Sequence, residues 1–263
     1  MIASAADLTA DLYFAAALRA GADSSFTRLL PLASLPGPLA PHDRFSQRIL
    51  LALQGLGYIE PELSLSQAQD WLYSRDWLSH GFENVAWRIL RPPQPSTNAL
   101  QHWAEGTDTT TCVLETWVSV WEDLALAEVA EYTRWSLEHA GFNPNWADQA
   151  TGALMAGLEK FSAQQVMYLV YLALRSLALM HQKATARIAQ LGHLFSSSIS
   201  NYVQRAAAER WTIRGMTRTP DLPRSAITVL FADTVTGLGE RYYSDCPSLG
   251  ALVRAITSRQ TLH

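Results

Sequence analysis

Cysteine is almost missing from this 263-residue sequence, in which Cys112 and Cys246 are the only two. Two cysteines are too few for a disulfide scaffold, and these two lack the paired spacing of a zinc site. The first residues also lack the basic stretch of a secretory signal, and Asp7 and Asp11 interrupt the apolar residues there. These absences predict a protein of the reducing cytoplasm that is not exported.

Long hydrophobic runs are missing as well. The most apolar stretch, residues 166 to 180, spans 15 residues and includes Arg175, whereas a membrane-spanning helix needs about 20 mostly apolar residues. We therefore expect no membrane partner and interpret this stretch as a buried helix.

Lysine is scarce, since only Lys160 and Lys183 occur among the 20 basic residues, and an arginine-rich composition of this kind favours a GC-rich bacterial source. The charges are also unevenly distributed. Residues 1–180 hold 10 Lys+Arg and 19 Asp+Glu, a net charge of −9, whereas residues 181–263 hold 10 and 5, a net charge of +5. Such a charge asymmetry suits docking against another protein or a nucleic acid.

Familiar catalytic motifs are missing too. The sequence contains no phosphate-binding loop, no G-x-S-x-G elbow, and no H-E-x-x-H, C-x-x-C or G-x-G-x-x-G pattern. The seven histidines are scattered without ligand spacing. We therefore predict a protein that is not an enzyme and that has neither a metal site nor a cofactor.

What the sequence does contain is apolar residues at helical spacing along most of its length. Two long helices stand out, at 112–140 and at 163–182, and Ser162 with Gln165 forms a capping box before the second. We predict an all-α protein, an irregular multi-helix bundle around these two central helices. Residues 227–231 fit a helix, but they are also compatible with a minor C-terminal strand.

Shorter helices are predicted from the same spacing and from stop signals. They cover residues 5–19, 24–30, 45–56, 64–72, 77–90, 184–193, 196–211 and 248–258. A cluster of prolines at Pro92, Pro93 and Pro95 is the best domain boundary. It divides the chain into an N-terminal helical region, 1–93, and a C-terminal helical bundle, 94–263, whose last third is basic.

Eight of the nine tryptophans lie between Trp71 and Trp146. Trp117, Trp121 and Trp135 fall along one stripe of the long helix at 112–140, which favours a role in the core. An aromatic ligand pocket or a partner-binding face is the alternative interpretation.

One acidic and one basic residue lie where apolar side chains are expected. Glu128 falls on the tryptophan stripe, and Arg175 lies within the most apolar helix. Because a buried arginine usually persists only when it is paired, we predict a buried ion pair between Glu128 and Arg175. The alternative is an anion-binding or catalytic cavity between the two central helices.

The most specific local pattern lies at 184–205. A predicted turn at Leu191, Gly192, His193 and Leu194 separates two helices, and Ile199 takes an apolar position on the second. The segment resembles a degenerate helix-turn-helix motif in which the glycine comes one residue early. The resemblance implies a set of polar residues facing a DNA groove and two arginines reaching phosphates. The groove-facing residues would be Ser196, Ser197, Ser200, Asn201 and Gln204, and the arginines would be Arg205 and Arg210.

Two functions therefore stay open. We expect a non-enzymatic protein-interaction protein of adaptor, inhibitor or immunity type in a bacterial cytosol, because catalytic motifs are missing, aromatic residues are dense and the charge is split. The alternative is a nucleic-acid-binding regulator that uses the segment 184–205. The sequence carries no signal for an oligomeric state.

Overall fold

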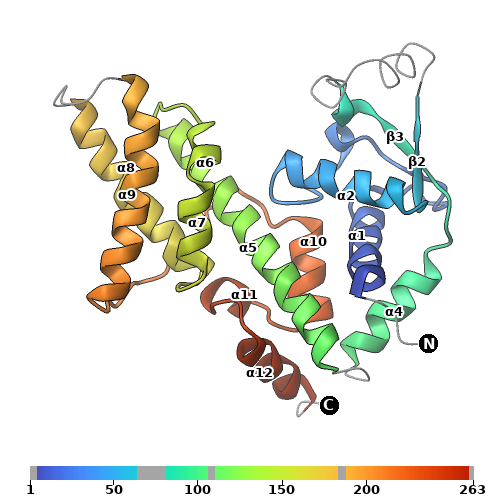
Figure 1. Cartoon of the computed structure of the whole chain (residues 1–263). Helices are drawn as coiled ribbons and strands as arrows, with labels where there is room; N and C mark the ends of the chain where they lie inside the picture. Colours follow the sequence, from blue (N-terminus) through green and yellow to red (C-terminus); the bar gives the residue numbers. More distant parts are fainter. Residues whose placement is uncertain (1–4, 64–80, 106–109, 183–187, 261–263) are drawn as a thin grey trace. The chain divides into compact units, whose positions relative to one another are not determined.

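The computed structural model describes residues 5–63, 81–105, 110–182 and 188–260. This part of the chain contains eleven α-helices and one small antiparallel sheet, so the predicted all-α class is confirmed (Figure 1). The chain forms two compact units. Unit 1 holds residues 1–116, 223–237 and 258–263, and unit 2 holds residues 117–222 and 238–257. The boundary predicted after residue 93 stays a prediction.

Unit 1 is organised around helix α1 (Ala5–Gly21), which packs against α2, α4 and α10. Its side chains at Leu12 and Phe14 are completely buried. Helix α2 starts at an N-cap, because Nδ1 of His42 accepts a hydrogen bond from the backbone N–H of Phe45 at 3.2 Å. The other helices of this unit are α2 (Asp43–Gly55), α4 (Gln94–Ala104), α10 (Ala226–Val229) and the π-helical turn η4 (Leu230–Val235).

A three-stranded antiparallel sheet completes unit 1, in the order β1-β3-β2. Its strands are β1 (Arg28–Leu29), β2 (Ile59–Glu62) and β3 (Ala86–Ile89), and the 3-10 turns η1 (Leu32–Ser34) and η3 (Phe82–Asn84) lie in the same unit. On β3, Trp87 is buried whereas Arg88 is exposed and pairs with Glu60 of β2. The helices predicted at 24–30 and through 85–90 are therefore wrong, because cross-strand pairing decides these short segments.

Helix α4 was not predicted, because the proline cluster was interpreted as a stop signal. The prolines instead lie at the start of this helix, with Pro93 at the N-cap and Pro95 in the first turn, where a missing N–H costs nothing. The helix predicted at 64–72 and the residues around Trp77 lie outside the described residues.

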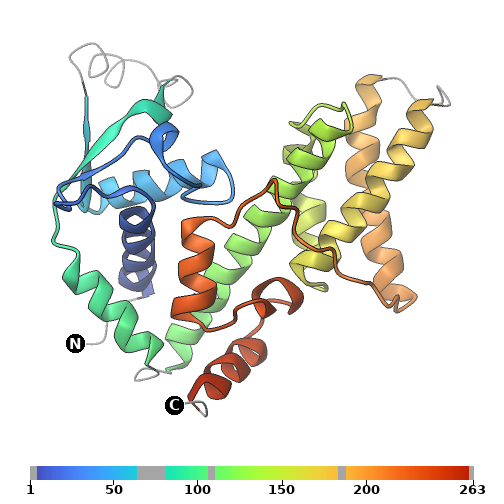
Figure 2. The same cartoon turned by 180° about the vertical axis from the view of Figure 1, so that it is seen from behind.

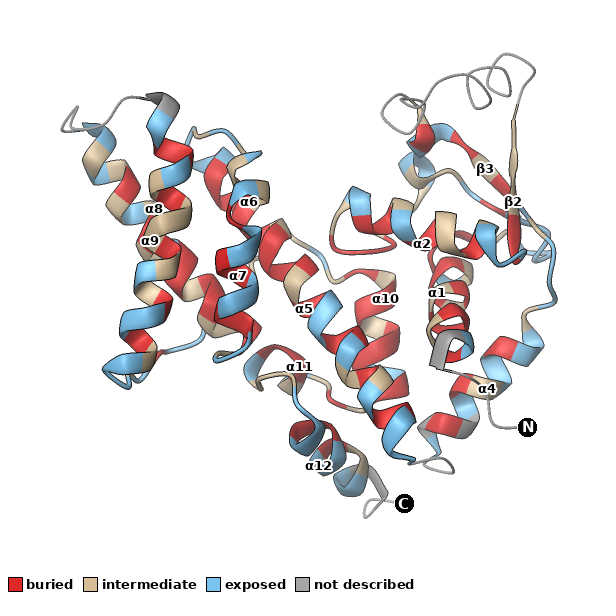
Figure 3. Cartoon of the chain, in the orientation of Figure 1, coloured by how far each residue is buried: buried red, intermediate tan, exposed pale blue. Residues whose placement is uncertain are grey.

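Unit 2 consists of helices from both halves of the chain. Helix α9 packs against α6, α7 and α8, and buried and exposed positions alternate along it (Figure 3). The helices are α5 (Thr111–His139), which enters this unit at Trp117, α6 (Trp146–Gln149), α7 (Thr151–Leu158), α8 (Ala163–Gln182), α9 (Ile188–Ala208), α11 (Arg241–Ser244) and α12 (Leu249–Gln260), which belongs to this unit as far as Thr257.

Both predicted long helices are confirmed as α5 and α8. The capping box of α8 forms as expected, since Gln165 Oε1 accepts from the backbone N–H of Ser162 at 3.0 Å and Ser162 Oγ accepts from that of Gln165 at 3.4 Å. By length and composition α8 could also cross a membrane, with a mean hydropathy of 1.2 over its best window, 39% of which is buried within the protein. Its buried side chains, such as Val170 and Leu177, are typical of a core helix.

The tryptophan stripe of α5 is confirmed as core packing. Trp117 and Trp121 are completely buried, and Trp121 Nε1 donates to the carbonyl of Tyr242 at 3.1 Å. The rings of Trp121 and Tyr242 stack at a centroid distance of 6.2 Å. Trp135 is half-buried, and its ring centroid lies 4.2 Å from the ring centroid of His139.

The turn of the predicted helix-turn-helix is wrong, because α9 is one continuous helix through residues 191–194. Gly192 serves close packing instead. A Cβ atom at this position would lie 2.7 Å from both Gln149 Oε1 and Trp146 Cδ1, on the facing helix α6. Residues 184–187 of the predicted motif lie outside the described residues. The alternative strand at 227–231 is also wrong, since these residues form α10 and the start of η4.

Candidate functional site

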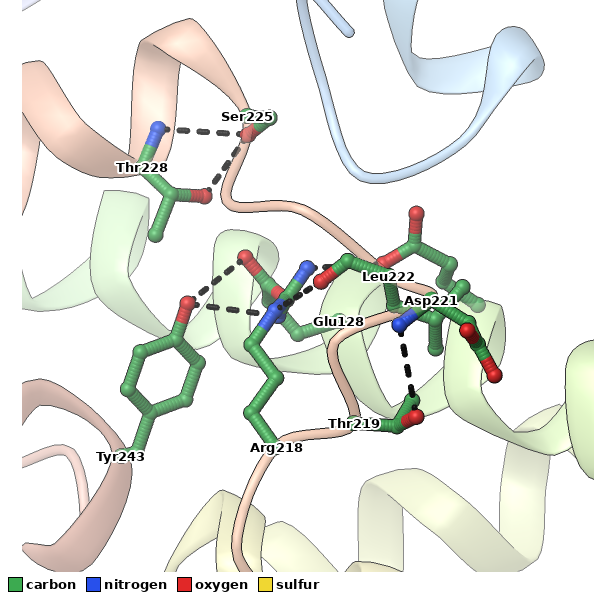
Figure 4. Close-up of polar contacts among 9 residues, drawn as sticks. Glu128, Arg218, Thr219, Asp221, Leu222, Ser225, Thr228 and Tyr243 are labelled. Atoms are coloured by element: carbon green, nitrogen blue, oxygen red, sulfur yellow. Dashed lines mark hydrogen bonds and ion pairs between the residues drawn. The ribbon is translucent and has the colours of Figure 1, made fainter. Parts of the chain in front are cut away.

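A closed polar cluster forms around Glu128 in unit 2 (Figure 4). Glu128 is completely buried and forms an ion pair with Arg218 Nη1, while its Oε1 accepts from the Tyr243 hydroxyl at 3.3 Å. Arg218 Nη2 also donates to Glu131 Oε2 at 3.2 Å. Both carboxylate oxygens of Glu128 are thus occupied by protein donors, which is the arrangement a buried charge requires.

The predicted pair of Glu128 with Arg175 is wrong. Arg175 is exposed, and its guanidinium lies 5.8 Å from the ring centroid of Tyr171, one turn earlier on α8. The sequence identified the buried carboxylate correctly but not its cation. Arg218 lies 90 residues further along, in a segment without regular structure, where no periodicity marks it.

Arg218 belongs to an irregular segment, residues 211–222, which we name the strap (Figure 2), and its bonds stabilise the position of this segment. Arg218 Nε donates to the Leu222 carbonyl at 2.6 Å within the strap. Further back, the backbone N–H of Met216 donates to the Gln164 carbonyl at 3.1 Å, and Gln165 Nε2 donates to the Ile213 carbonyl at 3.3 Å. The cluster therefore positions the strap on α5 and α8 and has the chemistry of a structural contact.

The residues predicted to bind nucleic acid lie on α9, except Arg210, which lies just beyond its end. Ser196 Oγ donates to the Gln149 carbonyl at 3.3 Å, so it faces α6. Asn201, Gln204 and Arg205 are exposed and line one polar groove of about 340 Å³. Ser197 and Ser200 are partly buried on α9, and Arg210 lies beyond its end with a positive φ of 51°.

Arg205 already has partners within the chain. Its Nε lies 3.4 Å from Glu209 Oε1, and its guanidinium lies 5.3 Å from the Trp211 ring centroid. Trp211 Nε1 also donates to Glu209 Oε2 at 2.6 Å, and this bond lowers the pKa of the Glu209 carboxyl. A phosphate group would have to compete with Glu209 for Arg205. Nucleic-acid contact through these residues stays a prediction.

A second candidate site, in unit 1, is the tight loop that follows α1. Its centre is Asp23, whose Oδ1 accepts the backbone N–H of Thr27 at 2.8 Å and whose Oδ2 accepts the Thr27 and Ser25 hydroxyls at 2.8 and 2.9 Å. Desolvation is the largest single effect and opposes ionisation of this carboxyl, but the hydrogen bonds from Thr27, Ser25 and Arg28 together outweigh it and lower its pKa to about 2. Short polar side chains therefore hold the backbone of this loop in one conformation.

The loop presents Phe26 in an unusual way. Its φ is 54°, in the left-handed region that bulky residues rarely adopt, and 52% of its surface is exposed. Both features are unfavourable for an isolated protein, because the backbone is strained and an aromatic ring faces water. Strained residues of this kind cluster at functional sites, so Phe26 is a candidate binding residue.

Phe26 borders an apolar groove of about 460 Å³ within unit 1. Ala15 and Leu18 of α1, Pro93, and Leu230 of η4 also supply apolar lining, and Thr97 of α4 is among the polar lining residues. Among the described residues, Arg19 is the one charged residue of the lining. The groove thus combines an exposed aromatic ring, an apolar surface and a single cation.

The π-helical turn η4 borders the same groove. It begins at Leu230, and Arg224 holds it through two bonds to Asp233, Nη1 to Oδ2 at 3.0 Å and Nη2 to Oδ1 at 2.9 Å. π-Helical turns are rare and often lie at functional sites. Two local irregularities, the positive φ of Phe26 and this turn, therefore meet at one groove.

In the described part of the chain, no three His, Cys, Asp or Glu side chains are grouped so that they could hold a metal ion. Comparisons with protein-family models, with curated proteins and with solved structures found no match.

The groove at Phe26 is the site that the sequence did not predict. A polar Asp-Ser-Ser run marks a turn there, but no local pattern predicts a phenylalanine with positive φ.

Proposed function

We propose that this chain is a non-enzymatic protein-interaction protein of adaptor, inhibitor or immunity type in a bacterial cytosol, and that its Phe26 groove binds a segment of a partner protein. The observation that carries the proposal is Phe26 itself, an exposed ring on a strained but firmly bonded loop beside an apolar groove. A rigid aromatic anchor contributes contact area at little cost in conformational entropy, as binding hot spots do.

The charge of the groove indicates the kind of segment. Arg19 lines the groove, and in the part of the chain that the structure describes no carboxylate lines it. An occupant with an apolar side chain for the groove and a carboxylate for Arg19 would satisfy both features. The partner segment is therefore expected to be acidic and apolar.

A display library of random short peptides tests this proposal. The full chain is panned, and the enriched peptides are measured against Phe26→Asn, which tolerates a positive φ but removes the ring. We expect enriched peptides to combine a large apolar residue with Asp or Glu, and to lose about tenfold or more in affinity for the variant. Peptides that bind the variant as tightly as the native chain would overturn the proposal.

The alternative, a nucleic-acid-binding regulator, rests on one observation, that Asn201, Gln204 and Arg205 line a common groove. Fluorescence anisotropy of labelled duplex and single-stranded DNA at low and high salt tests it. Binding that weakens with salt and is lost in an Arg205→Ala/Arg210→Ala variant would favour this function. An absence of binding at low salt would leave the basic third of the chain to a protein partner.

A further inference from the structure

A second groove, of about 420 Å³, lies entirely within unit 2. It is formed by Glu122, Asp123 and Leu126 on α5 and by Met155, Leu158 and Glu159 at the end of α7. Its volume is at the lower end of the range of about 300 to 1,000 Å³ found for ligand pockets, enough for a small number of side chains. It is separate from the Phe26 groove and shares no residue with it.

The base of this groove is apolar. Met155 is 51% exposed, one of the largest exposures among apolar side chains in the described residues. Leu158 is nearly buried beside it, and its carbonyl accepts a hydrogen bond from Cys246 Sγ at 3.4 Å. Methionine is unbranched and polarisable, so it adapts to different apolar partners and is common on peptide-binding surfaces.

The rim of the groove is acidic. Glu122, Asp123 and Glu159 are all exposed, and no Lys, Arg or His from the described ranges of the chain lines the groove. Burial, and after it the charge of Glu122, raises the pKa of the Cys246 thiol, which bonds to the Leu158 carbonyl. Such a rim attracts cations and repels phosphate groups.

Glu159 lies in a position that is unfavourable for the isolated chain. It is the C-cap residue of α7, and the C-terminal end of a helix carries a partial negative charge that favours cations. A carboxylate at this end raises the electrostatic energy of the helix. A positive charge placed in the groove would compensate both Glu159 and the helix end.

We infer that the groove at Met155 binds a basic segment of a partner protein, with an apolar side chain packed on Met155 and flanking Lys or Arg side chains paired with the carboxylates of Glu122 and Glu159. An amphipathic basic segment is recognised in this way by surfaces that combine methionine with carboxylates. The inference is independent of the Phe26 groove. Together the two grooves would let one chain bind two partners of opposite charge.

The test again uses a display library of random short peptides panned on the full chain. We expect a class of peptides in which a large apolar residue is flanked by Lys or Arg, with binding that weakens as salt rises. A synthetic peptide of this class is then titrated by fluorescence anisotropy. Met155→Ala and the double variant Glu122→Gln/Glu159→Gln should each weaken its binding by about tenfold.

Three matched controls separate this site from others. Leu179→Ala removes an equally exposed apolar side chain from α8, and Glu138→Gln removes an exposed carboxylate from α5 outside the groove. Phe26→Asn removes the ring of the other groove. All three should leave the affinity of the basic peptide unchanged.

The inference is overturned if basic apolar peptides are not enriched, or if the groove variants bind them as tightly as the native chain. It is also overturned if sedimentation shows that the chain associates with itself and that the groove variants abolish this association, since the occupant would then be a second copy. Loss of the acidic peptide class with retention of the basic class would reject the proposed Phe26 function alone.

Discussion

Arg218 in the strap forms an ion pair with Glu128, the completely buried carboxylate of α5, and so compensates its charge. Removing one member of a buried ion pair leaves an uncompensated charge, which costs about 3 to 5 kcal/mol. We therefore expect Arg218→Met to lower the free energy of unfolding by about that amount in urea titrations.

The control is Arg175→Ala on the exposed face of α8, which should change stability by less than about 0.5 kcal/mol. The double variant Glu128→Gln/Arg218→Met should recover much of the loss, because neither charge then remains buried. An equal cost for Arg175→Ala and Arg218→Met would contradict the assignment of the cation.

The strained backbone at Phe26 predicts that the glycine variant is more stable than the alanine variant, the reverse of the usual order. At ordinary loop positions alanine is more stabilising than glycine by about 0.4 to 1 kcal/mol, because glycine leaves the unfolded chain more freedom. At a φ of 54° the Cβ atom is unfavourable by about 1 to 2 kcal/mol. Phe26→Gly should therefore unfold at a higher urea concentration than Phe26→Ala, and the opposite order would show that the loop is unstrained.

The Asp23 loop predicts a pH dependence. The pKa of Asp23 falls from 3.8 to about 2 on folding, so the ionised carboxyl stabilises the folded state fully above about pH 4. This contribution is lost as the pH falls from 4 through 2. A carboxyl carbon NMR titration should give a midpoint near 2, and Thr27→Val should move it toward 3.8, whereas a midpoint already near 3.8 would refute the hydrogen-bonded loop.

The helical core was predictable because several local signals agree there. Helices α5 and α8 combine long apolar periodicity with a capping box or a glycine stop, and their ends lie within about one residue of the prediction. Val85, just before strand β3, and Ile89 at its end are four residues apart, a spacing that mimics a helix. Its true partners, on β1 and β2, are far away in sequence, and tertiary pairing overrides the local pattern.

The candidate site was less predictable than the fold. Glu128 was identified because a charge on an apolar stripe is visible in the sequence, but a pairing cation in an irregular segment is not. The Phe26 groove depends on a backbone dihedral and on the meeting of α1, α4 and η4. Neither property is encoded in the residues next to Phe26.

A substitution at Gly192 tests whether α9 packs closely against α6 at the place where the sequence predicted the turn of a helix-turn-helix. On α9 a Cβ at this position would lie 2.7 Å from Trp146 Cδ1, closer than side-chain carbons approach each other. We expect Gly192→Ala to destabilise unit 2 by about 1 to 3 kcal/mol, the usual cost of overpacking. Differential scanning fluorimetry or urea titration measures the change.

Gly152→Ala on α7 is the matched control, since a Cβ there meets nothing within 4 Å and the residue is exposed. This substitution should stabilise the helix by about 0.5 to 1 kcal/mol, because alanine restricts the unfolded chain and favours helix. Opposite signs for the two glycines would confirm that α6 packs directly against α9 at Gly192. If Gly192→Ala were also stabilising, the close approach of α6 would be wrong, and a turn near residue 192 would again have to be considered.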